Sequence, residues 1–275
     1  MDAPEGPTAR VARVRPPAVA GTFYPADRHE LEAVLDRCFE GAVLPERDAT
    51  VPKALVVPHA GLVYSGPVAA SAYLRLRDVG DRISRVVLIG PSHRVPVDGI
   101  AVSGADAFAG PFGEVAVDIE GRAIALSRPH VHVDDEAHRR EHCLEVQLPF
   151  LQRVLGCPFE IVPMVTGACP TGVVADVLDA LWGGPETLVV VSTDLSHYHR
   201  YRQAVRLDAA TAAEVVAGRH HAIGDLDACG SHSLRGLLAA SGVRGGRAEL
   251  IDLRNSGDTS GERDRVVGYG AFALA

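Results

Sequence analysis

The stretch TLVVVSTDLSHYHRY, residues 187–201, changes character near its middle. Residues 188–191 are apolar without interruption, which is typical of a strand buried on both faces of a sheet. Asp194, His197 and His199 follow within a few positions, although such side chains are costly to bury. The stretch therefore predicts a core strand that delivers polar groups to the edge of a sheet.

Two other apolar strands are predicted to end in the same way. KALVVPHAG contains His59 after its apolar run, and SRVVLIGPSH ends at His93. In open α/β sheets ligands bind outside the carboxyl ends of the strands, and parallel neighbours share that edge. One such histidine alone would more simply be a solvated loop residue or a helix cap. Because three strands repeat the pattern, we expect both histidines to lie beside Asp194 and His197.

Strand-like and helix-like segments alternate along the chain, with Asp27 as a plausible N-cap of the first helix and Gly41 beyond its end. Helices are expected within residues 28–40, 66–78, 143–155, 171–182, 201–218 and 231–242, and strands within 53–61, 84–93, 99–104, 113–119, 159–167, 187–194, 248–257 and 265–274. Pro149 is expected to kink or break the helix within residues 143–155. The two short strands at 99–104 and 113–119 are expected to be antiparallel around a turn.

This alternation predicts an α/β fold, a single domain with a central, largely parallel or mixed sheet flanked by helices. The Pro- and Arg-rich residues 1–17 are expected to form a flexible N-terminal segment, and residues 18–275 to form the domain. Neither an internal repeat nor a low-complexity linker divides the sequence.

The composition argues against several classes of partner. The 275 residues include 27 Lys and Arg against 35 Asp and Glu, which gives a net charge of −8. This balance argues against nucleic acid or an anionic membrane as the main partner. No apolar run approaches the roughly 20 residues of a membrane span, and the N-terminus lacks the apolar core of a secretory signal. We therefore expect a cytoplasmic protein.

The five cysteines argue against a disulfide framework, because their number is odd and no C-x-x-C pair occurs. Cys38, Cys157 and Cys169 are expected to be small buried hydrophobic residues. Cys229 differs because it directly precedes Gly230 and a predicted helix start. The positive potential of a helix N-terminus lowers the pKa of a thiol and favours the thiolate, which is a nucleophile and a soft metal ligand.

The segment DDEAHRREHCLEVQLPF contains His138, His142 and Glu145 near a predicted helix start. Spacings of four residues between the histidines and three between His142 and Glu145 allow each pair to share a helix face. We expect His142 and Glu145 in a pocket wall or behind metal ligands. A solvated helix start is the alternative interpretation.

These motifs together resemble the Memo family, in the bacterial branch called AmmeMemoRadiSam system protein B. The resemblance extends from residue 15 to about residue 240 and rests on several long motifs in the family's order. They are RPPAVAGTFYP, VPHAGLVYSGPVAASAY, LIGPSH, EHCLEVQLPFLQ, STDLSHY and ACGSHSLRGLL.

The resemblance implies a fold similar to that of class III extradiol dioxygenases, with a metal site at the edge of the sheet. The family's metal-binding residues correspond to His59, His93 and Cys229. Its Asp and His in the TDLSH motif correspond to Asp194 and His197, and the latter resembles the acid/base histidine of the dioxygenases.

His142, Glu145 and His232 are then expected in the surrounding pocket. A site of two histidines and one cysteine suits iron or copper, which the resemblance favours, and also zinc.

Three functions follow as hypotheses. The first is a metal-dependent redox enzyme, with His197 as general acid/base and Asp194 as an orienting group. The second is a non-catalytic binding module for a peptide or protein partner in a radical-SAM-associated system, with radical-SAM and AMMECR-type proteins as partners. The third is a zinc hydrolase, in which water occupies the fourth metal position. The same cluster is also compatible with a vestigial site held by hydrogen bonds.

Overall fold

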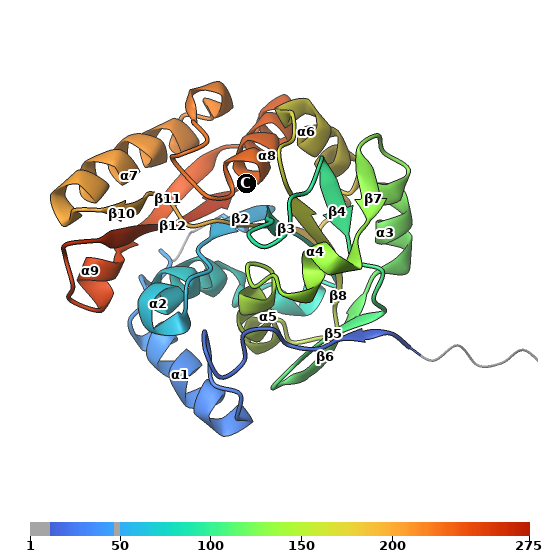
Figure 1. The fold of residues 1–275 in the computed structure, drawn as a ribbon, viewed down its shortest axis with the longest axis horizontal. Helices are drawn as coiled ribbons and strands as arrows, with labels where there is room; N and C mark the ends of the chain where they lie inside the picture. Colours follow the sequence, from blue (N-terminus) through green and yellow to red (C-terminus); the bar gives the residue numbers. More distant parts are fainter. Residues whose placement is uncertain (1–11, 47–49) are drawn as a thin grey trace, which may run out of the picture.

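The computed structural model describes residues 12–46 and 50–275, which form one α/β domain built on a mixed sheet (Figure 1). The strands are β1 (Val14–Arg15), β2 (Ala54–Val57), β3 (Arg85–Pro91), β4 (Ile100–Val102), β5 (Ala107–Gly110), β6 (Gly113–Val117), β7 (Val131–Val133), β8 (Glu160–Thr166), β9 (Thr187–Ser192), β10 (His197–His199), β11 (Ala248–Asn255) and β12 (Val266–Leu274). Their order is β1-β5-β6-β8-β3-β9-β2-β12-β10, with β11 beside β12 and β4 between β7 and β8.

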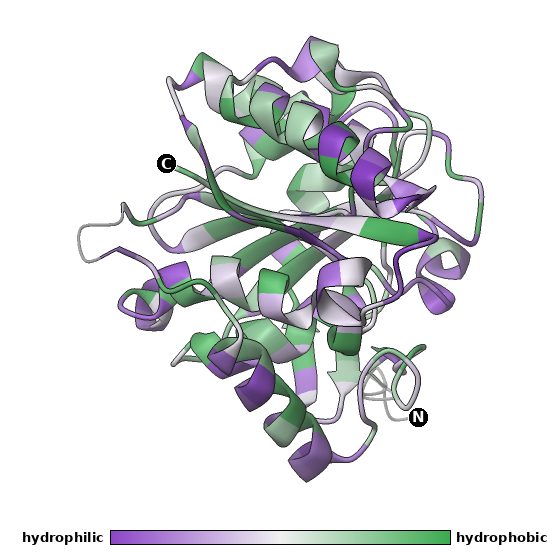
Figure 2. Cartoon of the chain, turned by 90° about the vertical axis from the view of Figure 1, so that its left-hand side faces the viewer, coloured by the Kyte–Doolittle hydropathy of each residue, from purple (hydrophilic) through white to green (hydrophobic). Residues whose placement is uncertain are grey.

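Helices cover both faces of the sheet. They are α1 (Arg28–Glu40), α2 (Leu62–Tyr73), α3 (Ile119–Leu126), α4 (Asp135–Arg139), α5 (Leu148–Val154), α6 (Thr171–Ala180), α7 (Tyr201–Val216), α8 (Ser231–Val243) and α9 (Ser256–Thr259). Helices α1, α2 and α5 lie on one face, and α6, α7 and α8 lie on the other; Figure 2 shows the largely hydrophobic strands between these layers. Within the described ranges, no helix combines the length and apolar character that a membrane crossing requires.

The central strands β3, β9 and β2 are parallel neighbours, as the sequence predicts. Leu88 of β3 pairs with Val190 of β9, and Ile89 pairs with Val191. Leu88 and Val190 belong to the apolar core under α1, α2 and α5, whereas Ile89 and Val191 belong to the core on the other face. Burial on both faces explains the uninterrupted apolar runs, and the parallel direction brings three strand ends to one edge.

Local signals also place the first helix correctly. The Asp27 carboxylate accepts hydrogen bonds from the N–H groups of His29 and Glu30 at the start of α1, and Gly41 lies at its C-terminal cap. These contacts satisfy backbone groups that a helix end otherwise leaves without partners.

Two parts of the expected layout differ in the structure: the break expected at Pro149 comes before this residue, and β6 has another partner. The helix expected over residues 143–155 is divided into a 3-10 turn at Glu145–Gln147 and the separate helix α5, with Pro149 in the first turn of α5. Proline is favoured there because its missing N–H would have no helical partner. Strand β6 pairs antiparallel with β5, which the sequence did not suggest, and not with residues 99–104.

A buried ion pair anchors the N-terminal part of the domain. Arg15 is 6% exposed and pairs with the carboxylate of Glu145, which is 1% exposed. The same carboxylate accepts from the N–H groups of Ala18 and Val19 and from the Tyr24 hydroxyl, at 2.7, 3.0 and 2.6 Å. Because the buried Glu145 carboxylate accepts from so many donors, it holds residues 15–24 against the rest of the domain.

The boundary expected at residue 17 is therefore too late. Residues 1–11 lie outside the described residues, but Val14 and Arg15 already form β1 by pairing with β5. The Arg- and Pro-rich composition indicated flexibility, and the buried partner of Arg15 overrides that indication.

Replacing Arg15 with Met should lower the free energy of unfolding by about 3 kcal/mol, because the Glu145 carboxylate would stay buried without its cation. Denaturant titration of both proteins measures this difference. Arg139→Met is the control, because Arg139 pairs with Glu136 on the exposed surface of α4 and its loss should change stability little. Equal losses in the two variants would contradict the anchoring role of Arg15.

His138 is a neutral donor inside the core. It is 1% exposed, and its Nε2 lies 3.0 Å from the Ala101 carbonyl oxygen, to which it donates. Burial lowers the pKa of His138 from 6.5 to about 4, although the hydrogen bond to Ala101 opposes this shift. The folded protein therefore takes up this proton at a lower pH than the unfolded chain.

Between pH 6.5 and about 4 the unfolded chain binds a proton here that the folded protein does not. Stability should therefore fall as the pH falls through this window, by up to about 3 kcal/mol from this group. His138→Gln can keep a donor to Ala101 without this titration, so its stability should decline less steeply. Unfolding free energies of both proteins across this range test the prediction, and parallel curves would disprove it.

Candidate metal centre

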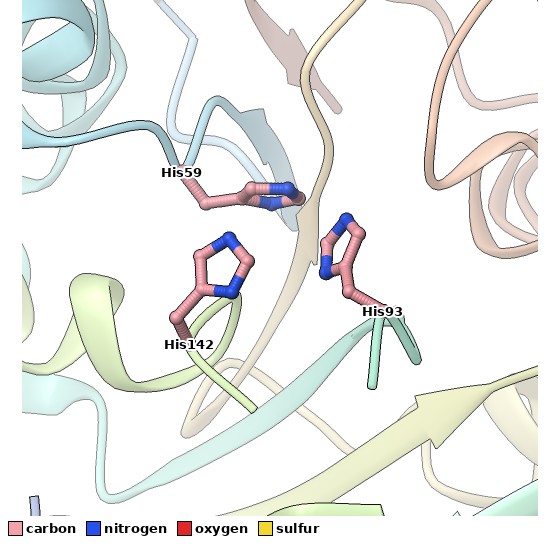
Figure 3. Close-up of side chains that lie close together, drawn as sticks. All are labelled: His59, His93 and His142. Atoms are coloured by element: carbon pink, nitrogen blue, oxygen red, sulfur yellow. The ribbon is translucent and has the colours of Figure 1, made fainter. Parts of the chain in front are cut away.

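Three histidine side chains face a common space at the carboxyl edge of the parallel strands (Figure 3). His59 follows β2, His93 follows β3, and His142 lies between α4 and the turn at Glu145–Gln147. One ring nitrogen from each lies within 4.8 Å of the other two. The ring centroids of His59 and His93 are 5.1 Å apart, and those of His93 and His142 are 4.7 Å apart. Such a group can hold a metal ion.

Ser192, the last residue of β9, determines the tautomer of His59. Its hydroxyl has one proton, which it donates to the Cys143 carbonyl oxygen at 2.7 Å. The Ser192 oxygen therefore accepts from Nε2 of Gln147 and from Nδ1 of His59, each at 2.9 Å. His59 is consequently protonated on Nδ1, and its Nε2 keeps the lone pair that a metal ion requires.

The His59 ring is also held in its neutral form. It is 1% exposed, and burial lowers its pKa well below 6.5, with His93 and His142 acting in the same direction. A neutral imidazole is the form that binds metals, so burial prepares His59 as a ligand.

A buried carboxylate, Glu141, organises the other two rings. Its Oε1 lies 2.8 Å from Nδ1 of His93, and its Oε2 accepts from the His93 N–H at 2.6 Å. Burial alone would raise the pKa of Glu141, but contacts with His142 and His93 outweigh it and hold this pKa well below its usual range. In the neutral ring, the ionised carboxylate keeps the His93 proton on Nδ1 and leaves Nε2 without a proton.

His142 lies nearer the centre than the pocket wall expected for it. Its Nδ1 is 3.2 Å from Oε1 of Glu141, but this buried nitrogen has no well-aligned hydrogen-bond partner in the described residues. The expected helical face shared with His138 is wrong, because α4 ends at Arg139 and His138 turns into the core. The loop that leaves α4 places His142 opposite His93.

Cys229 lies against His59, beside the group of three rings. Its Sγ is 3.3 Å from Nε2 of His59 and accepts from the Asp194 N–H at the same distance. The expected lowering of its pKa is wrong, because burial raises this pKa to about 12 and the Asp194 charge adds to the effect. Hydrogen bonds with the Thr193 hydroxyl and with the N–H groups of Asp194 and Gly230 only partly oppose this shift, so the thiol is neutral unless a metal ion displaces its proton.

Asp194 and His197 line the same cavity as the histidine rings. Oδ1 of Asp194 accepts from the His59 N–H at 2.8 Å, and burial raises the pKa of this carboxyl. Nδ1 of His197 lies 2.8 Å from the Leu195 carbonyl oxygen and must donate to it. In its neutral form His197 therefore carries its proton on Nδ1 and presents an unprotonated Nε2, the form of a general base.

The cavity has a volume of about 590 Å³, which suits a small-molecule ligand. Aromatic and cationic side chains join the histidines in its lining, namely Phe23, Tyr64, Arg94, Tyr198, Arg265 and Tyr269.

Two residues expected in the pocket point elsewhere. The Glu145 carboxylate is used by Arg15 and the N-terminal segment, as described above. Nδ1 of His232 lies 2.8 Å from the Cys169 carbonyl oxygen, and His232 is absent from the lining of the cavity. His199, to which the sequence assigned no role, does not line the cavity either.

The sequence interpretation missed the groups that orient the rings. Glu141 immediately precedes His142, and an acid beside a candidate ligand is a signal that could have identified it. Ser192 and Gln147 gave no comparable signal, because each meets His59 or its partner only through tertiary packing.

Another buried acidic side chain, that of Asp208, holds the turn that carries His197. Oδ1 of Asp208 in α7 accepts from the Ser196 N–H at 3.0 Å. On β12, a Cβ at Gly268 would lie 2.1 Å from Oδ2 of Asp208, so only glycine leaves room for this carboxylate. Tyr198, which follows His197, has a φ of 61°. This backbone conformation is strained for a residue other than glycine, and the surrounding contacts must maintain it.

Gly268→Ala should therefore displace Asp208 and cost about 1–3 kcal/mol of stability, as overpacking does. It should also shift the imidazole NMR signals of His197. Gly172→Ala in α6 is the control, because a Cβ there meets nothing within 4 Å. If Gly268→Ala left stability and the His197 signals unchanged, the close packing of Asp208 would have no role in holding this turn.

Comparison with known proteins finds similarity over nearly the whole chain. The model of the family described as "Memo-like protein" matches residues 15–273. A MEMO1 family protein of Aquifex aeolicus is 36% identical over 274 residues, covering 94% of this chain and 97% of that protein. MEMO1 family proteins of Methanosarcina acetivorans and Ignicoccus hospitalis are 36% and 37% identical, covering 95% and 94% of this chain and 99% and 97% of their own lengths. The chain belongs to the Memo family.

Proposed function

We propose that this protein is a metal-dependent oxidoreductase that holds iron or copper through His59, His93 and His142. One observation carries the proposal. The hydrogen bonds to Ser192 and Glu141 place the protons of neutral His59 and His93 on Nδ1, so that each Nε2 keeps its lone pair, and one ring nitrogen from each of the three histidines lies within 4.8 Å of the other two. The buried Nδ1 of His142, without a well-aligned partner, fits the same interpretation.

The donor set fits a transition metal. Imidazole nitrogens suit iron, copper and zinc, whereas harder cations prefer oxygen ligands. Cys229, 3.3 Å from Nε2 of His59, adds a soft donor that favours iron, copper or zinc further. Bound iron or copper would supply electron transfer to or from a substrate in the cavity.

The other polar residues of the cavity act on protons and on orientation. His197 can accept a proton from a substrate hydroxyl, because its Nδ1–H is used by Leu195 and its Nε2 is free. Asp194 holds the backbone of His59 and thereby fixes where this ring sits. Aromatic side chains line the cavity beside these residues.

Anaerobic titration with Fe(II) and Cu(I) should show one tight site per chain. Glu141→Gln removes a charged partner behind His93, so it should weaken metal binding about 10–100-fold. His142→Ala removes a ligand and should weaken it more. Cys229→Ala should weaken it less than His142→Ala, because Cys229 touches the group through His59 alone.

His232→Ala is the matched control, because His232 lies outside the cavity and its loss should leave metal affinity unchanged. Protein that binds none of iron, copper or zinc would reject the proposal and favour a module that binds a peptide or protein partner. Zinc as the sole tightly bound metal, together with ester or amide hydrolysis, would favour a hydrolase.

A further inference from the structure

Two arginines at the cavity have no acidic partner. Arg94 follows His93, and Arg265 precedes β12; both line the cavity and both are exposed. Among the described residues, neither makes an ion pair or a side-chain hydrogen bond, although the chain carries a net charge of −8. Some arginines elsewhere are paired, such as Arg85 with Asp118 and Arg153 with Asp36, but Arg94 and Arg265 are distinguished by lining the cavity without such a partner in the described part of the chain. The donors of Arg94 and Arg265 are therefore available to a ligand.

Arg265 is held in a defined orientation. Its guanidinium carbon lies 5.0 Å from the centre of the Tyr198 ring. Contact with the face of an aromatic ring leaves the N–H groups at the edge of the guanidinium free, and this planar fork matches an oxyanion. The Tyr198 ring is 63% exposed, although its backbone adopts the strained φ of 61°. The strained conformation costs free energy, and it places this ring at the cavity.

The charge at the cavity mouth suits a single negative charge on the ligand. Arg94 and Arg265 contribute two positive charges and Glu262 one negative charge, a balance of +1. Asp194 is buried below the mouth, where its Oδ1 accepts from the His59 N–H, so it is not part of this balance. A carboxylate monoanion matches this balance better than a phosphate dianion.

The cavity walls suit a planar ring. Phe23, Tyr64 and Tyr269 line it together with Tyr198, and the volume of about 590 Å³ accommodates one small aromatic molecule. Aromatic side chains bind flat apolar rings by offset or edge-to-face packing.

We propose that this cavity binds a small aromatic carboxylate, with its carboxylate on Arg94 and Arg265 and its ring between the tyrosines and the histidines. Any chemical reaction of this ligand rests on the proposed function, because the bound metal would carry it out. Its binding through the arginines does not, and it can be measured separately.

The test compares 4-hydroxybenzoate with 4-methylphenol, which differ by a carboxylate in place of a methyl group. Calorimetry or ligand-observed NMR is carried out on metal-free protein in chelator and on protein loaded anaerobically with Fe(II). In both states the carboxylate should bind at least about 10-fold more tightly than 4-methylphenol, since a charge-assisted contact is worth this much. Added salt should reduce the difference.

Arg94→Gln and Arg265→Gln should each weaken 4-hydroxybenzoate binding about 10-fold and leave 4-methylphenol binding unchanged. Arg263→Gln is the matched control. Arg263 also contacts a tyrosine face, that of Tyr201 at 4.4 Å, but does not line the cavity, so its loss should have little effect. This control removes the same charge two residues away from Arg265.

Equal binding of the two probes, failure of both to bind, or equal losses in all three arginine variants would overturn the inference. Tighter binding of phenyl phosphate than of 4-hydroxybenzoate would overturn the assignment to a carboxylate. If the carboxylate preference holds in chelator while no metal binds, the inference stands and the proposed metal function fails.

Discussion

The hydroxyl group of Ser192 is the interaction on which the site depends. It stands at the end of β9, between β2 and β3, and its single proton is committed to the Cys143 carbonyl oxygen. Every other contact of this oxygen must therefore be a donor, and one of them is Nδ1 of His59. A core hydrogen bond thus determines which nitrogen of a buried histidine faces the cavity.

Glu141 performs the corresponding task for His93, at the cost of burying a carboxylate. Burial disfavours the charged form, and only the donors that converge on both oxygens keep it ionised. The two networks meet at His142 and Cys143, which belong to one loop. The loop between α4 and α5 is therefore as important to the site as the three strands.

The fold was predictable because it follows from local patterns. Uninterrupted apolar runs indicated strands covered on both faces, and Asp27 and Gly41 marked the ends of a helix. Parallel pairing of β2, β9 and β3 then accounts for the meeting of His59, His93, Asp194 and His197 at one cavity. The loop from residue 140 to 147 was not predictable in this way, because it lacks a regular period and is shaped by Glu141 and Arg15.

The sequence by itself therefore determined the fold class, the family resemblance and the edge of the sheet where polar side chains gather. Tertiary structure alone decided which atoms of those side chains are protonated and which residues they contact. Cys229 illustrates the physical reason: its place before a helix indicates a lowered pKa, whereas burial beside Asp194 raises that pKa to about 12. Desolvation and hydrogen bonding depend on neighbours distant in sequence, such as Ser192 for His59 and Asp208 for the His197 turn, and only the folded chain brings them together.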